Sequence, residues 1–252
     1  MSSFSAGAAI LALTVGATWM GWRLVGKLPP QILDVDTRDV LKMLIGVLGT
    51  LSALVLSLLI NSARASYDQQ HQEVMELSAK LLSLDRALAR YGPDAGPIRR
   101  DLKTLVAAAV EELWPADPRK AARVDAPMKE EVWVQRLQSL SPVGESQRLA
   151  RDQAVTLATD IMNLRWLLYE QSTGSVPTVM LAVLSTWFGL IFFCIGLLSP
   201  RTSHALLPVL ILLSCGSVSA AMVLGLELDR AFEGLLRVSG EPVLKALSHL
   251  GQ

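Results

Sequence analysis

Ionisable side chains in this sequence gather where apolar stretches begin or end. Arg64 follows one apolar run and Arg165 precedes another, while Glu227, Asp229 and Arg230 come at the end of the last run. Charged groups at a membrane boundary often pair with each other or line a water-filled path. These five residues therefore have two interpretations. They form either an arginine–carboxylate clamp that joins helix ends, or an ion vestibule or ligand site.

The rest of the sequence lacks the residue patterns of common catalytic and metal sites. The histidines, His71, His204 and His249, stand far apart and have no partner at metal-ligand spacing. Cys194 and Cys215 both fall in apolar runs, where we expect them to be small packing residues. Phosphate-binding glycine loops and the nucleophile motif Gly-x-Ser-x-Gly are missing as well. We therefore predict that the protein is not an enzyme and uses no metal and no cofactor.

The composition is that of a membrane protein. Hydrophobic residues make up 51% of the chain, charged residues make up 18%, and the mean hydropathy is +0.40. The 23 Lys and Arg residues balance the 23 Asp and Glu residues, and most of them lie between residues 64 and 176. Because that charged segment is near neutral and has no basic stripe, we expect no nucleic-acid partner.

Four apolar segments are long enough to cross a bilayer of about 30 Å as helices. They are residues 4–24, 43–60, 176–198 and 205–226. The sequence therefore predicts an all-α integral membrane protein with four transmembrane helices and an extramembrane helical bundle between spans two and three. The predicted segments are 1–62 (spans one and two), 63–175 (the bundle), 176–227 (spans three and four) and 228–252 (an amphipathic tail). We expect the tail to lie in the membrane interface or to pack against the bundle.

The second apolar segment is predicted to continue as a helix beyond the membrane, over 40–91, because no proline and few glycines interrupt it. Beyond the membrane its apolar residues alternate spacings of three and four, which is a heptad seam that requires a helical partner. The seam is Val74, Leu77, Leu81, Leu84, Leu88 and Tyr91. A second seam is Ala154, Leu157, Ile161, Leu164 and Leu168. We predict that the two seams pack antiparallel, covered by an amphipathic helix over 98–113, and that Ser141 and Pro142 start the helix carrying the second seam.

The second span carries both small and polar residues. Gly46 and Gly49 are predicted points of close helix approach. Ser57 and Asn61 are polar, and serines in membrane helices usually bond back to their own helix, so packing is one interpretation. Pore lining is the other, with Asn61 at the membrane boundary. Charge does not decide the orientation of the spans, because the two sides carry similar numbers of Lys and Arg residues near the membrane.

Motifs spread along nearly the whole chain resemble a family of uncharacterised bacterial membrane proteins that is labelled bestrophin-like. They include Leu54-Val-Leu-Ser-Leu-Leu-Ile-Asn-Ser-Ala-Arg64, Leu84-Asp85-Arg86, Arg90-Tyr91-Gly92-Pro93, Trp114-Pro115, Arg165-Trp166-Leu167-Leu168, Leu228-Asp229-Arg230 and Val238-Ser239-Gly240-Glu241-Pro242. The motifs fall in the order that this family shows.

The resemblance implies a multi-pass protein of the bacterial inner membrane, with the termini and the helical domain in the cytoplasm. Bestrophins are pentameric anion channels whose second span lines the pore, so it also implies a homo-oligomer, a pentamer by analogy, that conducts an inorganic anion. This chain departs from the family's aromatic constriction. Leu54, Leu58 and Ile60 would instead form a hydrophobic gate that closes by dewetting. The acidic run of a calcium-binding clasp is missing after span four, so calcium gating is not expected.

Two functions therefore remain open at this stage. The first is an oligomeric ion channel with Leu54, Ser57, Leu58 and Asn61 lining its path. The second is a non-conducting membrane scaffold or sensor whose helical domain binds a partner protein through its heptad seams. A membrane-embedded enzyme is a weaker third reading, because no nucleophile, base or metal set is visible.

Overall fold

The computed structural model describes residues 3–29, 32–115, 128–171, 178–199, 206–229 and 237–251. The helices of this part of the chain are α1 (Ser3–Val25), α2 (Val35–Tyr91), the short 3-10 helix η1 (Pro93–Ala95), α3 (Gly96–Leu113), α4 (Met128–Gln138), α5 (Glu145–Gln171), α6 (Thr178–Leu198), α7 (Leu206–Leu228) and α8 (Glu241–His249). The described residues contain no strand. Within this part, α1, α2, α6 and α7 are long and apolar enough to cross a membrane. The predicted all-α, four-span fold class is confirmed.

The chain forms two compact units, and α2 contributes residues to both of them. The membrane unit comprises Met1–Ala65 and Ser175–Asp229, and the extramembrane unit comprises Ser66–Gly174 and Arg230–Gln252. Each unit has a hydrophobic core of its own. We describe each unit by itself.

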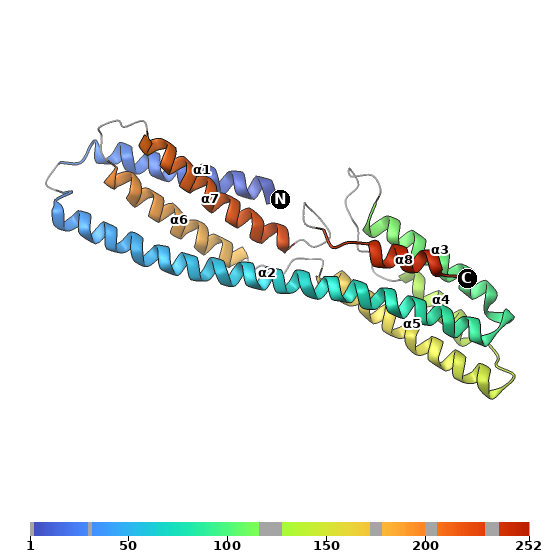
Figure 1. Cartoon of the computed structure of the whole chain (residues 1–252). Helices are drawn as coiled ribbons and strands as arrows, with labels where there is room; N and C mark the ends of the chain where they lie inside the picture. The colour runs from blue at the N-terminus through green and yellow to red at the C-terminus, as the bar shows by residue number, and fades with distance from the viewer. Residues whose placement is uncertain are drawn as a thin grey trace. The chain divides into compact units, whose positions relative to one another are not determined.

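In the membrane unit, α1 packs closely against α6 and α7 (Figure 1). A methyl group at Gly21 would overlap the Phe193 carbonyl oxygen, and one at Gly196 would overlap the Thr18 carbonyl oxygen, so α1 and α6 touch backbone to backbone. On the α7 side, the Ser219 hydroxyl donates a hydrogen bond of 2.8 Å to the Gly7 carbonyl. Small residues give this packing its closeness, which compensates for the weak hydrophobic driving force between helices in lipid.

The first half of α2 belongs to the same unit and is covered on one side only. Ser52, Leu59 and Ala63 are buried, and Leu59 lies where a side chain at Gly225 of α7 would otherwise stand. Gly46 and Gly49 behave differently from the prediction, because no atom of the described residues lies within 4 Å of the position of a side chain at either glycine. They are not points of close approach within the chain. Gly46 is exposed and Gly49 is half-buried.

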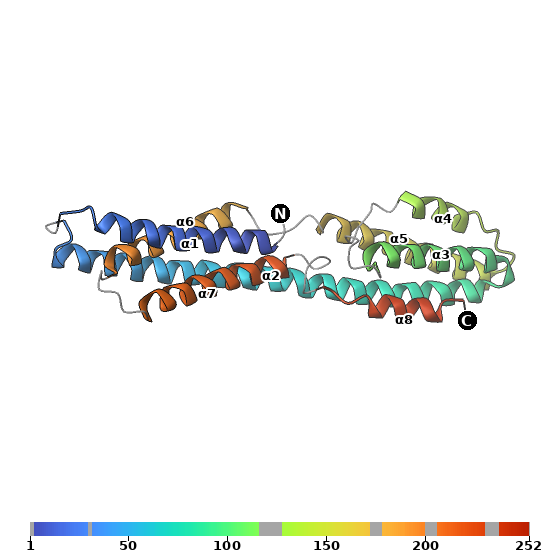
Figure 2. The same cartoon turned by 90° about the horizontal axis from the view of Figure 1, so that it is seen from above.

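The extramembrane unit is built around the second half of α2, with α3, α5 and α8 beside it (Figure 2). Val74, Leu77, Leu81, Leu84, Leu88 and Tyr91, the whole first seam, are buried. Side-chain hydrogen bonds between α2 and α5 show that the two helices run antiparallel. Lys80 donates to Asp160 at 2.6 Å, and Arg90 donates to Gln153 at 2.7 Å. The second seam is less uniformly buried, because Leu157 and Leu164 are only partly covered while Ala154 and Ile161 are in the core.

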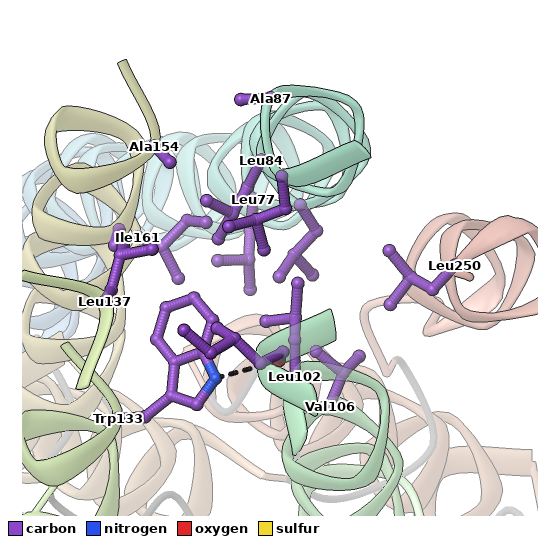
Figure 3. Packing of buried hydrophobic residues seen from close by; sticks show 14 of the residues in the cluster. Leu77, Leu84, Ala87, Leu102, Val106, Trp133, Leu137, Ala154, Ile161 and Leu250 are labelled. Atoms are coloured by element: carbon purple, nitrogen blue, oxygen red, sulfur yellow. Dashed lines mark hydrogen bonds between the residues drawn. The ribbon is translucent and has the colours of Figure 1, made fainter. Parts of the chain in front are cut away.

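Residues of α3, α4 and α5 complete this core (Figure 3). Leu102 and Val106 of α3 point toward Leu77 and Leu84 of α2, and Trp133 of α4 fills the space between α3 and α5. The Trp133 indole donates a hydrogen bond of 3.2 Å to the Ile98 carbonyl, so its polar atom is satisfied in the core.

The C-terminal part of the chain packs against the bundle. Val243, Ala246 and Leu250 of the α8 region are buried, and the Trp114 indole donates to the Val238 carbonyl at 2.8 Å. The described part of the tail, 237–251, therefore follows the second of the two predicted placements. Phe232 and its neighbours, 230–236, lie outside the described residues.

Two helix starts differ from the sequence prediction. The helix predicted from residue 40 begins at Val35, because the Asp34 carboxylate accepts a hydrogen bond of 2.8 Å from the Thr37 backbone N–H and caps it. The helix predicted to start at Ser141 and Pro142 begins at Glu145. There the Gln147 side chain accepts a hydrogen bond from the Val143 N–H at 2.9 Å, so the turn continues past the proline.

Candidate functional site

Among the described spans, α2 is the least covered by the rest of the chain. Only 11% of the most apolar 18-residue window of α2 is buried, against 28% in α1, 33% in α6 and 22% in α7. Exposed residues recur along it at helical spacing: Val40, Met43, Val47, Leu51, Leu54 and Leu58. We call this surface, residues 40 to 61 on the uncovered side of α2, the open face.

All four sequence-predicted pore residues lie on the open face. Leu54 is 68% exposed and Leu58 is 61% exposed, and both are among the most exposed large apolar residues of the chain. Ser57 and Asn61 are exposed as well. Residues spaced three or four apart share one side of a helix, so the four follow each other along a single stripe. The opposite side of the same two turns carries the buried Leu59 and Ala63.

The stripe alternates polar and apolar groups along the helix axis. Leu54 and Leu58 are one turn apart and contribute apolar side chains. Ser57 and Asn61 are also one turn apart and contribute a hydroxyl and an amide. Thr50, one turn before Leu54, binds its hydroxyl to the Gly46 and Val47 carbonyls at 3.0 and 2.8 Å. The Thr50 hydroxyl proton is therefore used by its own helix, which is the back-bonding expected of threonine in a membrane helix.

The predicted charge cluster is divided between the two units. Arg64, Glu227 and Asp229 belong to the membrane unit, where Glu227 is buried near the end of α7 and Arg64 is exposed. Arg165 belongs to the extramembrane unit. Arg230 lies outside the described residues. The choice between a clamp and an ion vestibule stays a prediction.

Arg165 has surroundings that the sequence did not indicate. It lines an almost wholly apolar cavity of about 60 Å³ inside the bundle, together with Leu77, Val106, Trp133 and Ile161. Apart from Arg165 its lining is almost entirely apolar, so it lacks the converging polar groups that a polar ligand needs. It is a packing defect of the bundle rather than a polar binding site.

Comparison with known proteins identifies relatives of this architecture. The family model described as "Bestrophin-like domain" matches residues 8–243. Among solved structures, a crystal structure of a bacterial bestrophin homologue from Klebsiella pneumoniae, carrying a tryptophan-to-alanine mutation, is similar with a TM-score of 0.64. The two chains are 14% identical, and the similarity covers 99% of each. None of the curated proteins compared with this chain matches it.

Proposed function

Because the chain belongs to the bestrophin-like family, we propose that it is a homo-oligomeric anion channel in which α2 lines the pore. The observation that carries the proposal is the open face of α2, which bears Leu54, Ser57, Leu58 and Asn61 and is the least covered part of the four spans. No atom of the described residues lies within 4 Å of a side-chain position at Gly46 or Gly49 on α2, which leaves room for a second copy to approach this helix closely.

The stripe on the open face suits the passage of an anion. The Asn61 amide and the Ser57 hydroxyl are hydrogen-bond donors, which can replace part of the hydration shell of an anion without binding it too tightly. Arg64 lies three residues after Asn61, on the same side by helical spacing, and adds a positive charge at this end of the stripe. Leu54 and Leu58 of several copies would form apolar rings, which close a narrow path by excluding water.

The family resemblance also sets the assembly and orientation that we propose. The oligomer is a pentamer of the bacterial inner membrane, and the protein is not an enzyme. Four spans place both termini and the extramembrane unit on one side, which we assign to the cytoplasm.

Anion flux from liposomes tests this proposal. The purified protein is reconstituted with trapped chloride or iodide, and efflux is followed after a potential is applied. We expect flux from the native protein, and a larger flux from L54A and L58A, since shorter side chains widen and wet the constriction. L212A is the matched control, because Leu212 is 55% exposed on α7 and lies outside the open face.

Two results would contradict the proposal. One is the absence of anion efflux at every potential and pH, from liposomes with the native protein and with both leucine variants. The other is an equal effect of L54A and L212A. The alternative function, a scaffold or sensor, would then return, supported by recovery of a stoichiometric soluble partner. The heptad seam no longer favours it, because α2 buries that seam inside its own chain.

A further inference from the structure

Three side-chain oxygens lie buried at the start of the extramembrane unit without a hydrogen-bond donor among the described residues. They are Gln70 Oε1, Glu73 Oε2 and Gln171 Oε1. Gln70 is 2% exposed and Glu73 is 7% exposed. A buried oxygen that has lost its water and gained no partner costs free energy, about 1–3 kcal/mol for a neutral group and more for a charged one. Glu73 is the neighbour of Gln70 on α2 and is hydrogen-bonded by Gln171, so the three oxygens belong to one cluster of side chains.

Hydrogen bonds hold these side chains in a fixed arrangement. The Gln69 and Gln171 amides both donate to Glu73 Oε1, at 3.0 and 3.1 Å, and the Gln70 amide donates to the Ser66 hydroxyl at 3.4 Å. Each amide nitrogen is thereby engaged, and the oxygens remain. Gln70 and Glu73 are three residues apart on α2, so they are neighbours on the helix surface. Gln171 reaches Glu73 from α5.

The lysine or arginine nearest to Glu73 along α2 is Lys80, and it has other partners. Lys80 binds Asp160 at 2.6 Å and Glu76 at 3.3 Å. Within the described part of the chain, the polar contacts of Glu73 are the two amide hydrogen bonds to its Oε1. A buried carboxylate without a positive partner is strongly unfavourable. A cation from outside the described side chains would compensate the negative charge of the Glu73 carboxylate.

Oxygen atoms of carboxylates and amides are the ligands that hard cations prefer, and water molecules complete their coordination. The set here has one formal negative charge, because Gln70 and Gln171 are neutral. A monovalent cation neutralises that charge, whereas a divalent cation would leave a net positive charge buried between two helices. We propose that Gln70, Glu73 and Gln171 bind an alkali cation, Na⁺ or K⁺, which bridges α2 and α5. This inference is independent of whether the protein conducts ions.

Thermal unfolding of the purified full chain in detergent tests the proposal. The Tm is measured in rising NaCl or KCl, with choline chloride at the same concentration as the reference for ionic strength and chloride. For a site with a Kd of about 10 mM, 300 mM of the cation should raise the Tm by roughly 4–8 °C over choline. The difference between the NaCl and KCl arms identifies the preferred ion.

Two variants make the result specific. E73Q removes the charged ligand but keeps its shape, and should abolish the difference between alkali and choline salts. E76Q removes a carboxylate one turn away that is 54% exposed, and should keep the difference.

Three outcomes would overturn the proposal. The first is a Tm of the native protein that is the same in alkali and choline salts. The cluster would then only join α2 to α5 by hydrogen bonds and bind no cation. The second is an alkali effect that survives in E73Q. The third is a larger stabilisation by millimolar CaCl₂ than by the alkali chlorides, which would assign the oxygens to a divalent ion.

Discussion

The ion pair between Asp85 and Arg99 ties α2 to α3, and we predict that it is the most sensitive polar contact of the extramembrane unit. The guanidinium meets the carboxylate in a two-pronged contact, Nε to Oδ1 at 2.8 Å and Nη2 to Oδ2 at 2.7 Å. The side chain of Asp85 is 7% exposed and that of Arg99 is 20% exposed. The hydrogen bonds that Arg99 donates to the Asp85 carboxylate raise the pKa of Arg99, so the guanidinium stays charged. The Gly251 N–H also donates to Asp85 Oδ2, at 3.3 Å.

Removal of Arg99 alone should be costly, because the Asp85 carboxylate would stay buried with one backbone N–H as its remaining partner among those named. Loss of one member of a buried pair costs about 3–5 kcal/mol. Since Arg99 is partly exposed and water can reach it, we expect the lower end, about 3 kcal/mol, for R99A. R99K keeps the charge but cannot make the two-pronged contact, so it should lose about 1–2 kcal/mol. Replacement of both residues by leucine removes both charges and should cost less than R99A alone.

The assay is thermal unfolding of the full chain in detergent, followed by tryptophan fluorescence. Trp114 and Trp133 lie in this unit and report its transition. At about 2–4 °C per kcal/mol, R99A should lower that transition by roughly 6–12 °C. A loss below about 1 kcal/mol for R99A would refute the reasoning. So would a double leucine variant that is less stable than R99A.

Three further predictions concern packing and pH. G196A should destabilise the membrane unit by about 1–3 kcal/mol in a denaturant titration, because the new methyl group meets the Thr18 carbonyl. G216A is the control and should be neutral or stabilising, because no described atom lies near a side chain at that position. Equal effects of the two variants would contradict the close approach of α1 and α6. A109V should raise the Tm of the bundle by a few degrees, because the valine side chain extends into the 60 Å³ cavity and each buried methylene adds about 0.8 kcal/mol of stability. A107V, at an exposed position, is the control and should leave the Tm unchanged. The hydrogen bond from Lys80 to Asp160 raises the pKa of Lys80 above 10.5 in the folded protein. The stability that this contact adds to the fold is therefore complete below pH 10.5 and is lost as the pH rises through the pKa of Lys80 in the folded state. The stability difference between the native protein and K80M should therefore shrink between pH 9 and pH 12, and a difference that grows over this range would contradict it.

Much of the fold was predictable because it depends on apolar periodicity. The four spans are long uninterrupted apolar runs, and the seam from Val74 to Tyr91 repeats at the heptad spacing that burial on one side requires. The start of α2 was placed too late because the cap at Asp34 lies before five residues of mixed polarity. The start of α5 was placed too early because a serine–proline pair resembles a cap but here lies in the preceding turn.

The sites were less predictable because they depend on which residues meet in space. Glycines in α2 signalled close helix approach, but the sequence could not say that Gly46 and Gly49 meet no described neighbour at their side-chain positions. Gln70 continues the heptad spacing four residues before Val74, yet a polar residue is not counted in an apolar seam. Its cluster with Gln171 depends on a contact between residues 98 positions apart, from Glu73 to Gln171. A polar residue at a seam position is the one sequence signal that could have indicated it.

The central claim is that the open face of α2 lines a water-filled anion path, and thiol accessibility tests it most directly. In a chain whose buried Cys194 and Cys215 are replaced by alanine, S57C, N61C and L212C are made one at a time. A charged, membrane-impermeant thiol reagent is then applied to the reconstituted protein while anion flux is recorded. We predict that S57C and N61C react and that their modification blocks flux, while L212C on α7 stays unreacted and conducts normally. Unreactive cysteines at 57 and 61, or modification there without any change in flux, would contradict the account.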